Sequence, residues 1–110
     1  MDTLEAFSAL DVRVGTVLAA EPFPEARKPA YKLTVDFGGE IGVKRSSVQI
    51  TVRYAIENLI GKQVLAVVNF PPKRIAGFPS DVLVLGVPDE LGNVVLVRPD
   101  FPLPNGGRLY

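Results

Sequence analysis

Residues 31–37 read YKLTVDF, and this stretch decides the fold because its apolar and polar residues alternate strictly. The apolar side chains on one face are Tyr31, Leu33, Val35 and Phe37. Such a period of two is typical of a β-strand with one buried face. The next two residues, Gly38 and Gly39, predict a tight turn into a second strand through Ile41 and Val43. The sequence therefore predicts an antiparallel hairpin in this region.

The second strand of this hairpin changes phase along its length. After Val43 the next apolar residues are Val48 and Ile50, an odd number of positions away. An extra residue in the segment 44–47 would explain the change as a β-bulge, which also bends a strand. Small barrels need such bends in order to close, so the pattern predicts a bulge here.

Further strands are expected on both sides of the hairpin. Residues 12–18 alternate again, and Gly15 inside them would permit a sharp bend. Downstream, residues 62–70 (KQVLAVVNF) and 81–87 are apolar on both faces, as central strands are. A last short strand is expected at residues 94–97, after a turn at 89–93.

Two helical segments are predicted. Thr51 can cap a helix over residues 52–60, where apolar residues follow the i, i+3, i+4, i+7 pattern and Gly61 supplies the stop. Residues 1–10 predict a short N-terminal helix or turn that lies on the barrel. Three strands, a helix and two strands is the order of the OB-fold, a five-stranded Greek-key barrel. We therefore expect residues 1–110 to form one all-β OB-fold domain with a short helix and a C-terminal extension, residues 88–110.

The composition favours a binding protein over an enzyme. The 110 residues are 47% hydrophobic and 22% charged, which fits one globular domain. There is no cysteine or histidine, which excludes disulfides, thiolate or imidazole metal sites and histidine-based triads. No phosphate loop of Walker or Rossmann spacing is present, so no cofactor is expected. No apolar stretch approaches the roughly 18 residues of a membrane span, and the N-terminus lacks a signal-peptide pattern. We expect a cytoplasmic protein that is not inserted into membranes.

Four motifs together resemble a known family. They are DVRVGTVLAAEPFPEA at 11–26, AYKLTVDFG at 30–38, LIGKQVLAVVNFPPKRIAGFPSDVLVLG at 59–86 and PNG at 104–106. They are similar to the tRNA-binding domain, which is appended to bacterial methionyl-tRNA synthetases and to the phenylalanyl-tRNA synthetase β subunit and also occurs as free-standing dimers. Among the free-standing members the chain most resembles the CsaA branch, described as secretion-related chaperones. In this family the Gly-x-x-Ser turn is usually followed by an acidic residue, a glycine and a methionine, whereas here Asp81, Val82 and Leu83 follow it. The departure implies a partner other than, or additional to, tRNA.

The stretch PPKRIAGFPS at 71–80 is the expected rim of the binding face. Pro71 and Pro72 end the preceding strand, because neither can donate to a ladder. The turn that follows is either a solvated strand connection or a rim whose bases meet phosphate or an acidic peptide. As one set, the basic residues predict a patch whose binding would weaken steeply with salt. The candidate binding residues are Arg13, Lys32, Lys44, Arg45, Ser47, Gln49, Asn69, Lys73, Arg74, Ile75, Phe78 and Ser80. The aromatic residues expected to be free for stacking are Phe23, Tyr54 and Phe78.

Two functions and one assembly state are expected. The resemblance implies a chaperone that binds unfolded peptides or preproteins for protein export without nucleotide hydrolysis. The alternative is a tRNA-binding protein that recognises tRNA shape through a basic face. A purely structural assembly module is the third possibility. The apolar strand at 94–97 and the proline-rich tail at 101–110 need cover, which predicts a homodimer.

Overall fold

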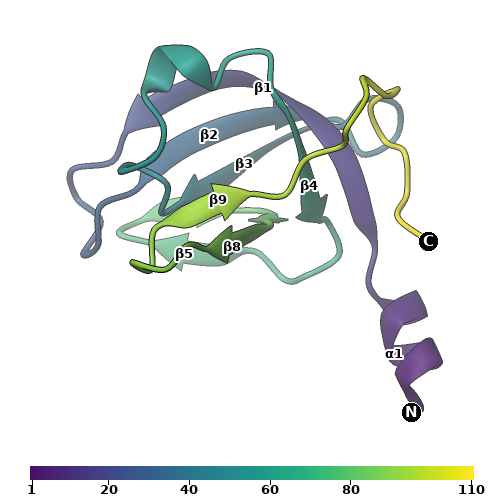
Figure 1. Ribbon diagram of the computed structural model, residues 1–110. Coiled ribbons are helices and arrows are strands. Elements are labelled where there is room, and N and C mark those ends of the chain that lie inside the picture. Colours follow the sequence, from purple (N-terminus) through teal and green to yellow (C-terminus); the bar gives the residue numbers. More distant parts are fainter.

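The computed structural model describes residues 1–110 and shows an antiparallel sheet that curls into a nearly closed barrel (Figure 1). Its strand order is β3-β2-β1-β4-β7. These strands are β1 (Val12–Pro22), β2 (Tyr31–Asp36), β3 (Val43–Val48), β4 (Gln63–Val67) and β7 (Leu83–Val84). Two small hairpins join β5 (Lys73–Ile75) to β6 (Phe78–Ser80) and β8 (Gly86–Pro88) to β9 (Val94–Leu96). The predicted all-β, five-stranded OB-type barrel is confirmed. None of its helices could span a bilayer.

Strand β1 is shared between the two halves of the barrel. Its residues 12–16 pair with β4, and its residues 16–22 pair with β2. Gly15 lies where this exchange occurs, and a Cβ there would stand 2.6 Å from Val35 Cγ1 and 2.8 Å from the Phe37 ring. The glycine is therefore required by the close approach of β2 to β1.

The predicted bulge in β3 is wrong. Strands β2 and β3 pair without interruption from Tyr31 opposite Val48 to Asp36 opposite Val43, and the register shift lies in β1 between residues 17 and 19. The pattern was misleading because Ser46 occupies an inward position: its side chain is buried and its Oγ donates to the Val82 carbonyl at 3.0 Å. Strand β3 therefore keeps one phase along its length, with Ser46 and Val48 facing inward and Val43 facing outward.

The predicted helix over 52–60 is also wrong. The segment contains only a 3₁₀ turn, η1 (Ile56–Asn58), and of its apolar residues only Leu59 is fully buried. Tyr54 holds the segment in an irregular path, since its carbonyl accepts from the Tyr31 hydroxyl at 2.7 Å and its own hydroxyl accepts from the Leu96 N–H at 3.0 Å. These tertiary bonds replace helical ones.

The N-terminal helix forms, but not in the expected place. Helix α1 (Thr3–Ala9) begins after Asp2, whose carboxylate accepts from the Glu5 N–H at 2.8 Å. It projects away from the barrel in Figure 1, and none of its residues is buried. The expectation that it lies on the barrel is therefore wrong.

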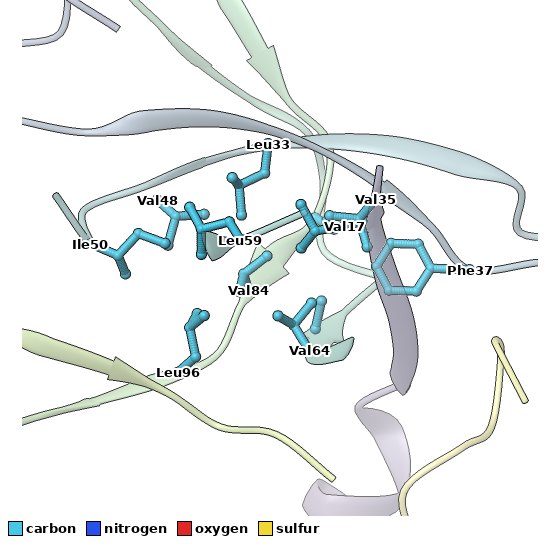
Figure 2. Packing of buried hydrophobic residues seen from close by; sticks show 12 residues of the cluster. Val17, Leu33, Val35, Phe37, Val48, Ile50, Leu59, Val64, Val84 and Leu96 are labelled. Atoms are coloured by element: carbon cyan, nitrogen blue, oxygen red, sulfur yellow. The ribbon is translucent and has the colours of Figure 1, made fainter. Parts of the chain in front are cut away.

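The core is a single apolar cluster inside the barrel. Figure 2 shows Phe37, Val35 and Val17 beside one another, with Val64 and Val84 near them in the interior, and it includes Leu96 of β9. Leu96 is 7% exposed, so β9 covers an open side of its own barrel. The barrel itself therefore covers the inner side of this strand, whereas Val95 on its other side stays 39% exposed.

The barrel is closed at the seam between β3 and residues 80–82. The Asp81 N–H donates to the Arg45 carbonyl at 2.8 Å, and the Arg45 N–H donates to the Asp81 carboxylate at 3.2 Å. The Ser47 N–H donates to Ser80 Oγ at 3.0 Å. Side-chain oxygens thus accept the N–H groups that a regular neighbouring strand would otherwise accept.

The apolar run expected as one strand over 81–87 is divided. Its first part is β7, which completes the barrel, and its second part is β8, which leaves the barrel to pair with β9. The strand expected over 62–70 ends at Val67, before the two prolines. The following hairpin turns at Ala76 and Gly77, both with positive φ (47° and 82°). This pair of angles is the geometry of a two-residue hairpin loop.

Candidate ligand-binding face of the barrel

Two aromatic rings and two cations meet on the outer face of β2 and β3. The Phe23 and Phe78 rings contact edge to face, with centroids 5.4 Å apart. Lys32 Nζ lies 4.8 Å from the Phe23 centroid and 5.3 Å from that of Phe78, while Arg45 Cζ lies 5.4 Å from the Phe78 centroid. We call these four residues the Phe78 cluster. They come from the loop after β1, from β2, from β3 and from β6.

Strand alternation explains why the two cations share this face. Lys32 is opposite Ser47 in the β2–β3 register, and Arg45 is opposite Thr34. Their neighbours Leu33 and Ser46 are fully buried in the barrel. Because successive side chains in a strand point to opposite faces, Lys32 and Arg45 point outward.

The cations of the cluster have no acidic partner. The ion pairs of the structure join Arg13 and Arg108 to Asp11, and Arg53 to Asp89. The ring faces carry negative partial charge and hold Lys32 and Arg45 in place without neutralising them. Lys32 and Arg45 thus form no ion pair, although Glu21 is opposite Lys32 in the β1–β2 register and the Asp81 carboxylate accepts from the Arg45 N–H at 3.2 Å.

The β5–β6 hairpin forms one rim of this face. Lys73 and Arg74 are exposed on β5, and the Arg74 guanidinium donates to the Gly77 carbonyl at 2.7 Å. Ile75 lies directly opposite Phe78 in the hairpin. The hairpin thus brings three expected site residues beside the cluster residue Phe78, and Phe78 connects them to Lys32.

Arg13 lies elsewhere. It pairs with Ala66 in the half of β1 that faces β4, whereas Lys32 pairs with Glu21 at the other end of β1. Its guanidinium donates to the Asp11 carboxylate and to the Gly106 carbonyl. The hydrogen bond to Asp11 raises the pKa of Arg13 above its ordinary value. Arg13 connects the tail to β1, and the single patch that included it does not form.

Three other expected residues also lie apart from the cluster or are already hydrogen-bonded. Asn69 accepts from the Asp11 N–H at 2.9 Å and donates to the Ala9 carbonyl at 2.8 Å, which ties α1 to the end of β4. Lys44 has the same phase as the buried Ser46 and so points away from the face of Arg45. Ser80 is engaged at the barrel seam.

The remaining expected residues border the cluster. Ser47 lies opposite Lys32, and Gln49 continues the same outward phase beyond the end of β3, where it is exposed. Sequence reasoning missed two exposed bases, Arg27 and Lys28, in the loop that also carries Phe23. Their position between two expected strands was the signal, because loops at this end of such a barrel border its ligand face.

Two aromatic residues differ from their expectation. Phe23 is only 4% exposed, since Lys32 and Phe78 cover it. Tyr54 is half-buried and uses its hydroxyl to hold β9. Of the three rings expected to be free for stacking, only Phe78 lies in the cluster with a partly open surface. No group of three or more acidic side chains is placed to hold a metal ion.

The fold and the position of the Phe78 cluster define this protein as an OB-type barrel with a candidate ligand face. An OB-type barrel binds its ligands on the face of its second and third strands, between the loops that follow its first and fourth strands. The Phe78 cluster occupies this position, with Phe23 from the first of these loops and Phe78 from the second.

The comparisons with known proteins specify the family. Residues 12–108 match the model of the putative tRNA-binding domain, and the chain belongs to this family. It is 58% identical to a solved structure of the chaperone CsaA from Bacillus anthracis, covering 100% of this chain and 99% of that one with a TM-score of 0.92. It is 50% identical to the CsaA chaperone protein from Picrophilus torridus, with full coverage of both chains and a TM-score of 0.92.

Synthetases carry a related segment. The methionine–tRNA ligase of Flavobacterium johnsoniae is 36% identical over 105 residues, which is 96% of this chain and 14% of the ligase. The chain therefore spans about one-seventh of that enzyme, and the match is to a segment of the ligase and not to its full length.

Proposed function

We propose that this protein is a chaperone of the CsaA type that binds unfolded polypeptides or preproteins in the cytoplasm, for protein export. The observation that carries the proposal is the Phe78 cluster, in which unpaired cations lie over apolar rings on the ligand face. The full-length similarity to two solved CsaA chaperones supports it. Binding is passive and involves no catalysis or nucleotide hydrolysis.

The chemistry of the cluster suits acidic and apolar segments. Lys32 and Arg45 attract carboxylates, and the partly open Phe78 ring and the half-buried Ile75 contact apolar side chains. Ion pairs at an exposed face contribute at most about 1 kcal/mol each. A client is therefore held weakly and leaves without an energy source.

We further propose that the protein is a homodimer. The Arg108 guanidinium donates to the Ser8 and Leu10 carbonyls, which places the C-terminal tail beside α1. The exposed apolar residues of these two segments include Leu4, Phe7, Phe101, Leu103, Leu109 and Tyr110. A second copy would cover both segments, and a monomer mass at micromolar concentration would contradict this.

The alternative function is recognition of tRNA. Membership of the putative tRNA-binding domain family favours it, as do the two cations of the Phe78 cluster that form no ion pair. Lys32, Arg45, Lys73 and Arg74 would then contact phosphates.

One titration separates the two functions. The protein is titrated with a permanently unfolded polypeptide and with tRNA at several salt concentrations, as wild type and as the Lys32→Ala/Arg45→Ala variant. The control variant Lys62→Ala/Arg98→Ala removes two positive charges away from the cluster. Polypeptide binding that persists in high salt and weakens in the first variant alone supports the chaperone. Binding of tRNA alone, with a steep salt dependence, supports the alternative, and binding of neither ligand contradicts both.

A further inference from the structure

A second feature lies next to the Phe78 cluster on the loop between β1 and β2. A shallow hollow of about 340 Å³, open to solvent, is lined by Pro22, Phe23, Pro24, Ala26, Arg27 and Pro29, together with Ala30 and Thr51. Its size is within the range of small-ligand sites, about 300–1,000 Å³. The hollow is separate from the barrel core and from the contacts of the C-terminal tail.

The hollow is preformed. Each proline fixes its own φ, so the walls lose little freedom when a ligand enters. The loop closes on itself through the Ala26 N–H, which donates to the Phe23 carbonyl at 3.2 Å. Phe23 is almost fully buried under Lys32 and Phe78 and cannot move away independently. Rigid apolar walls of this kind favour an apolar side chain.

One ring connects the hollow to the cations. Phe23 lines the hollow, and its face contacts Lys32 Nζ at 4.8 Å. In an extended chain, residues i and i+2 are about 6.6–6.8 Å apart along the strand. A ligand residue in the hollow thus places its near neighbours within reach of Lys32, and Arg27 adds a further positive charge on the hollow side.

We infer that the hollow takes an apolar side chain of an extended polypeptide while Lys32 and Arg45 take the carboxylate of an Asp or Glu within two residues of it. The inference rests on the proposed polypeptide binding and specifies the client sequence. A nucleobase fits less well, because Lys32 and Arg45 already occupy ring faces of the cluster. Of the residues that line the hollow, only Arg27 and Thr51 have side chains that could hydrogen-bond a base edge.

The test uses the full chain and three labelled synthetic peptides, measured by fluorescence anisotropy. The first peptide has a Gly/Ser background with Leu and Glu two positions apart, the second has Gly in place of Leu, and the third has Gln in place of Glu. We expect the second and the third each to bind about tenfold more weakly than the first. Equal binding of all three would overturn the inference.

A variant of the protein provides the reciprocal test. Ala26→Phe fills the hollow, and Ala55→Phe adds the same side chain at an exposed alanine that does not line it. We expect Ala26→Phe to bind the Leu–Glu peptide about tenfold more weakly and to lose the preference for Leu over Gly, while Ala55→Phe behaves as wild type. Circular dichroism melting confirms that both variants are folded. If Ala26→Phe does not fold, Ala26→Glu, which places a carboxylate in the hollow, is tested in its place.

The outcomes separate the two proposals. If filling the hollow leaves polypeptide binding unchanged, the proposed role of the hollow is refuted and the proposed chaperone function stays intact. No binding of any unfolded polypeptide by the wild type would refute both. If Ala26→Phe weakens tRNA binding and the peptides do not bind, the hollow belongs to an RNA site and the inference is wrong.

Discussion

The Ser80 hydroxyl accepts a hydrogen bond from the Ser47 N–H at 3.0 Å, across the seam where the barrel closes. Ser80→Ala leaves this half-buried N–H without its partner. We expect a loss of about 1 kcal/mol of unfolding free energy, measured by urea unfolding. Ser8→Ala, at an exposed helical serine, is the control and should change little. An unchanged unfolding free energy in Ser80→Ala would show that this hydrogen bond does not hold the barrel closed.

Gly15→Ala is expected to destabilise the fold through overpacking of the core. Its Cβ would lie 2.6 Å from Val35 Cγ1 and 2.8 Å from the ring of Phe37, both fully buried. Overpacking of this kind costs about 1–3 kcal/mol. Gly107→Ala is the matched control, because its nearest neighbour is at 3.5 Å. Equal melting temperatures of the two variants would contradict the prediction.

Ala76→Asn is expected to stabilise the protein. Ala76 has φ of 47°, a left-handed conformation that is unfavourable for alanine and well tolerated by asparagine. Asn-Gly is also the preferred pair in two-residue hairpin loops. We expect a gain of about 0.5–1 kcal/mol in thermal or urea unfolding. Ala6→Asn, at an exposed position inside α1, should give no such gain, because asparagine has a lower helix propensity than alanine.

The lowered pKa of Asp89 predicts a contribution to the unfolding free energy that is lost in acid. The hydrogen bond from Arg53, and next the backbone hydrogen bond from Asn93, lower the pKa of Asp89 below its ordinary value of 3.8. A lowered folded-state pKa stabilises the fold at pH above the unfolded-state value, and this contribution is lost as the pH falls through the folded-state value. We expect Asp89→Asn to be less stable than wild type at pH 7, with the difference shrinking below about pH 4. A urea midpoint difference that stays constant down to pH 3 would contradict this.

Alanine substitutions of Arg13 and Lys32 should have opposite effects on stability and on polypeptide binding. Arg13 holds Asp11 and the Gly106 carbonyl, so Arg13→Ala should destabilise the fold by about 1 kcal/mol and leave polypeptide binding unchanged. Lys32→Ala should weaken binding with little change in unfolding free energy. Urea unfolding and a polypeptide titration measure both effects, and loss of binding in Arg13→Ala would return this residue to the binding site.

Much of the candidate binding face could be predicted from the sequence. Alternation in residues 31–37 placed Lys32 on the outer face, and the motif at 71–80 placed Phe78 in the loop after the fourth barrel strand. Arg13 was misplaced because its phase is outward, but its strand runs from one end of the barrel to the other. Periodicity indicates which side of a strand a residue faces, and it carries no information on how far along the barrel that residue lies.

The errors share a physical origin. The helix predicted over 52–60 gives way to hydrogen bonds that Tyr54 accepts from the Tyr31 hydroxyl and the Leu96 N–H, 23 and 42 positions away in the chain. The bulge predicted near Ser46 is absent because a buried serine finds an acceptor in Val82, 36 positions away. Local propensity is overridden wherever a distant partner satisfies a polar group.

The sequence alone determined the OB-type fold class and the resemblance to the tRNA-binding family, because these depend on local alternation, turn residues and motifs. Only the tertiary structure decided which charges converge. Lys32 and Arg45 meet over Phe78, while Arg13 is bound to Asp11, because barrel curvature and strand register set the distances between residues that are far apart in the chain.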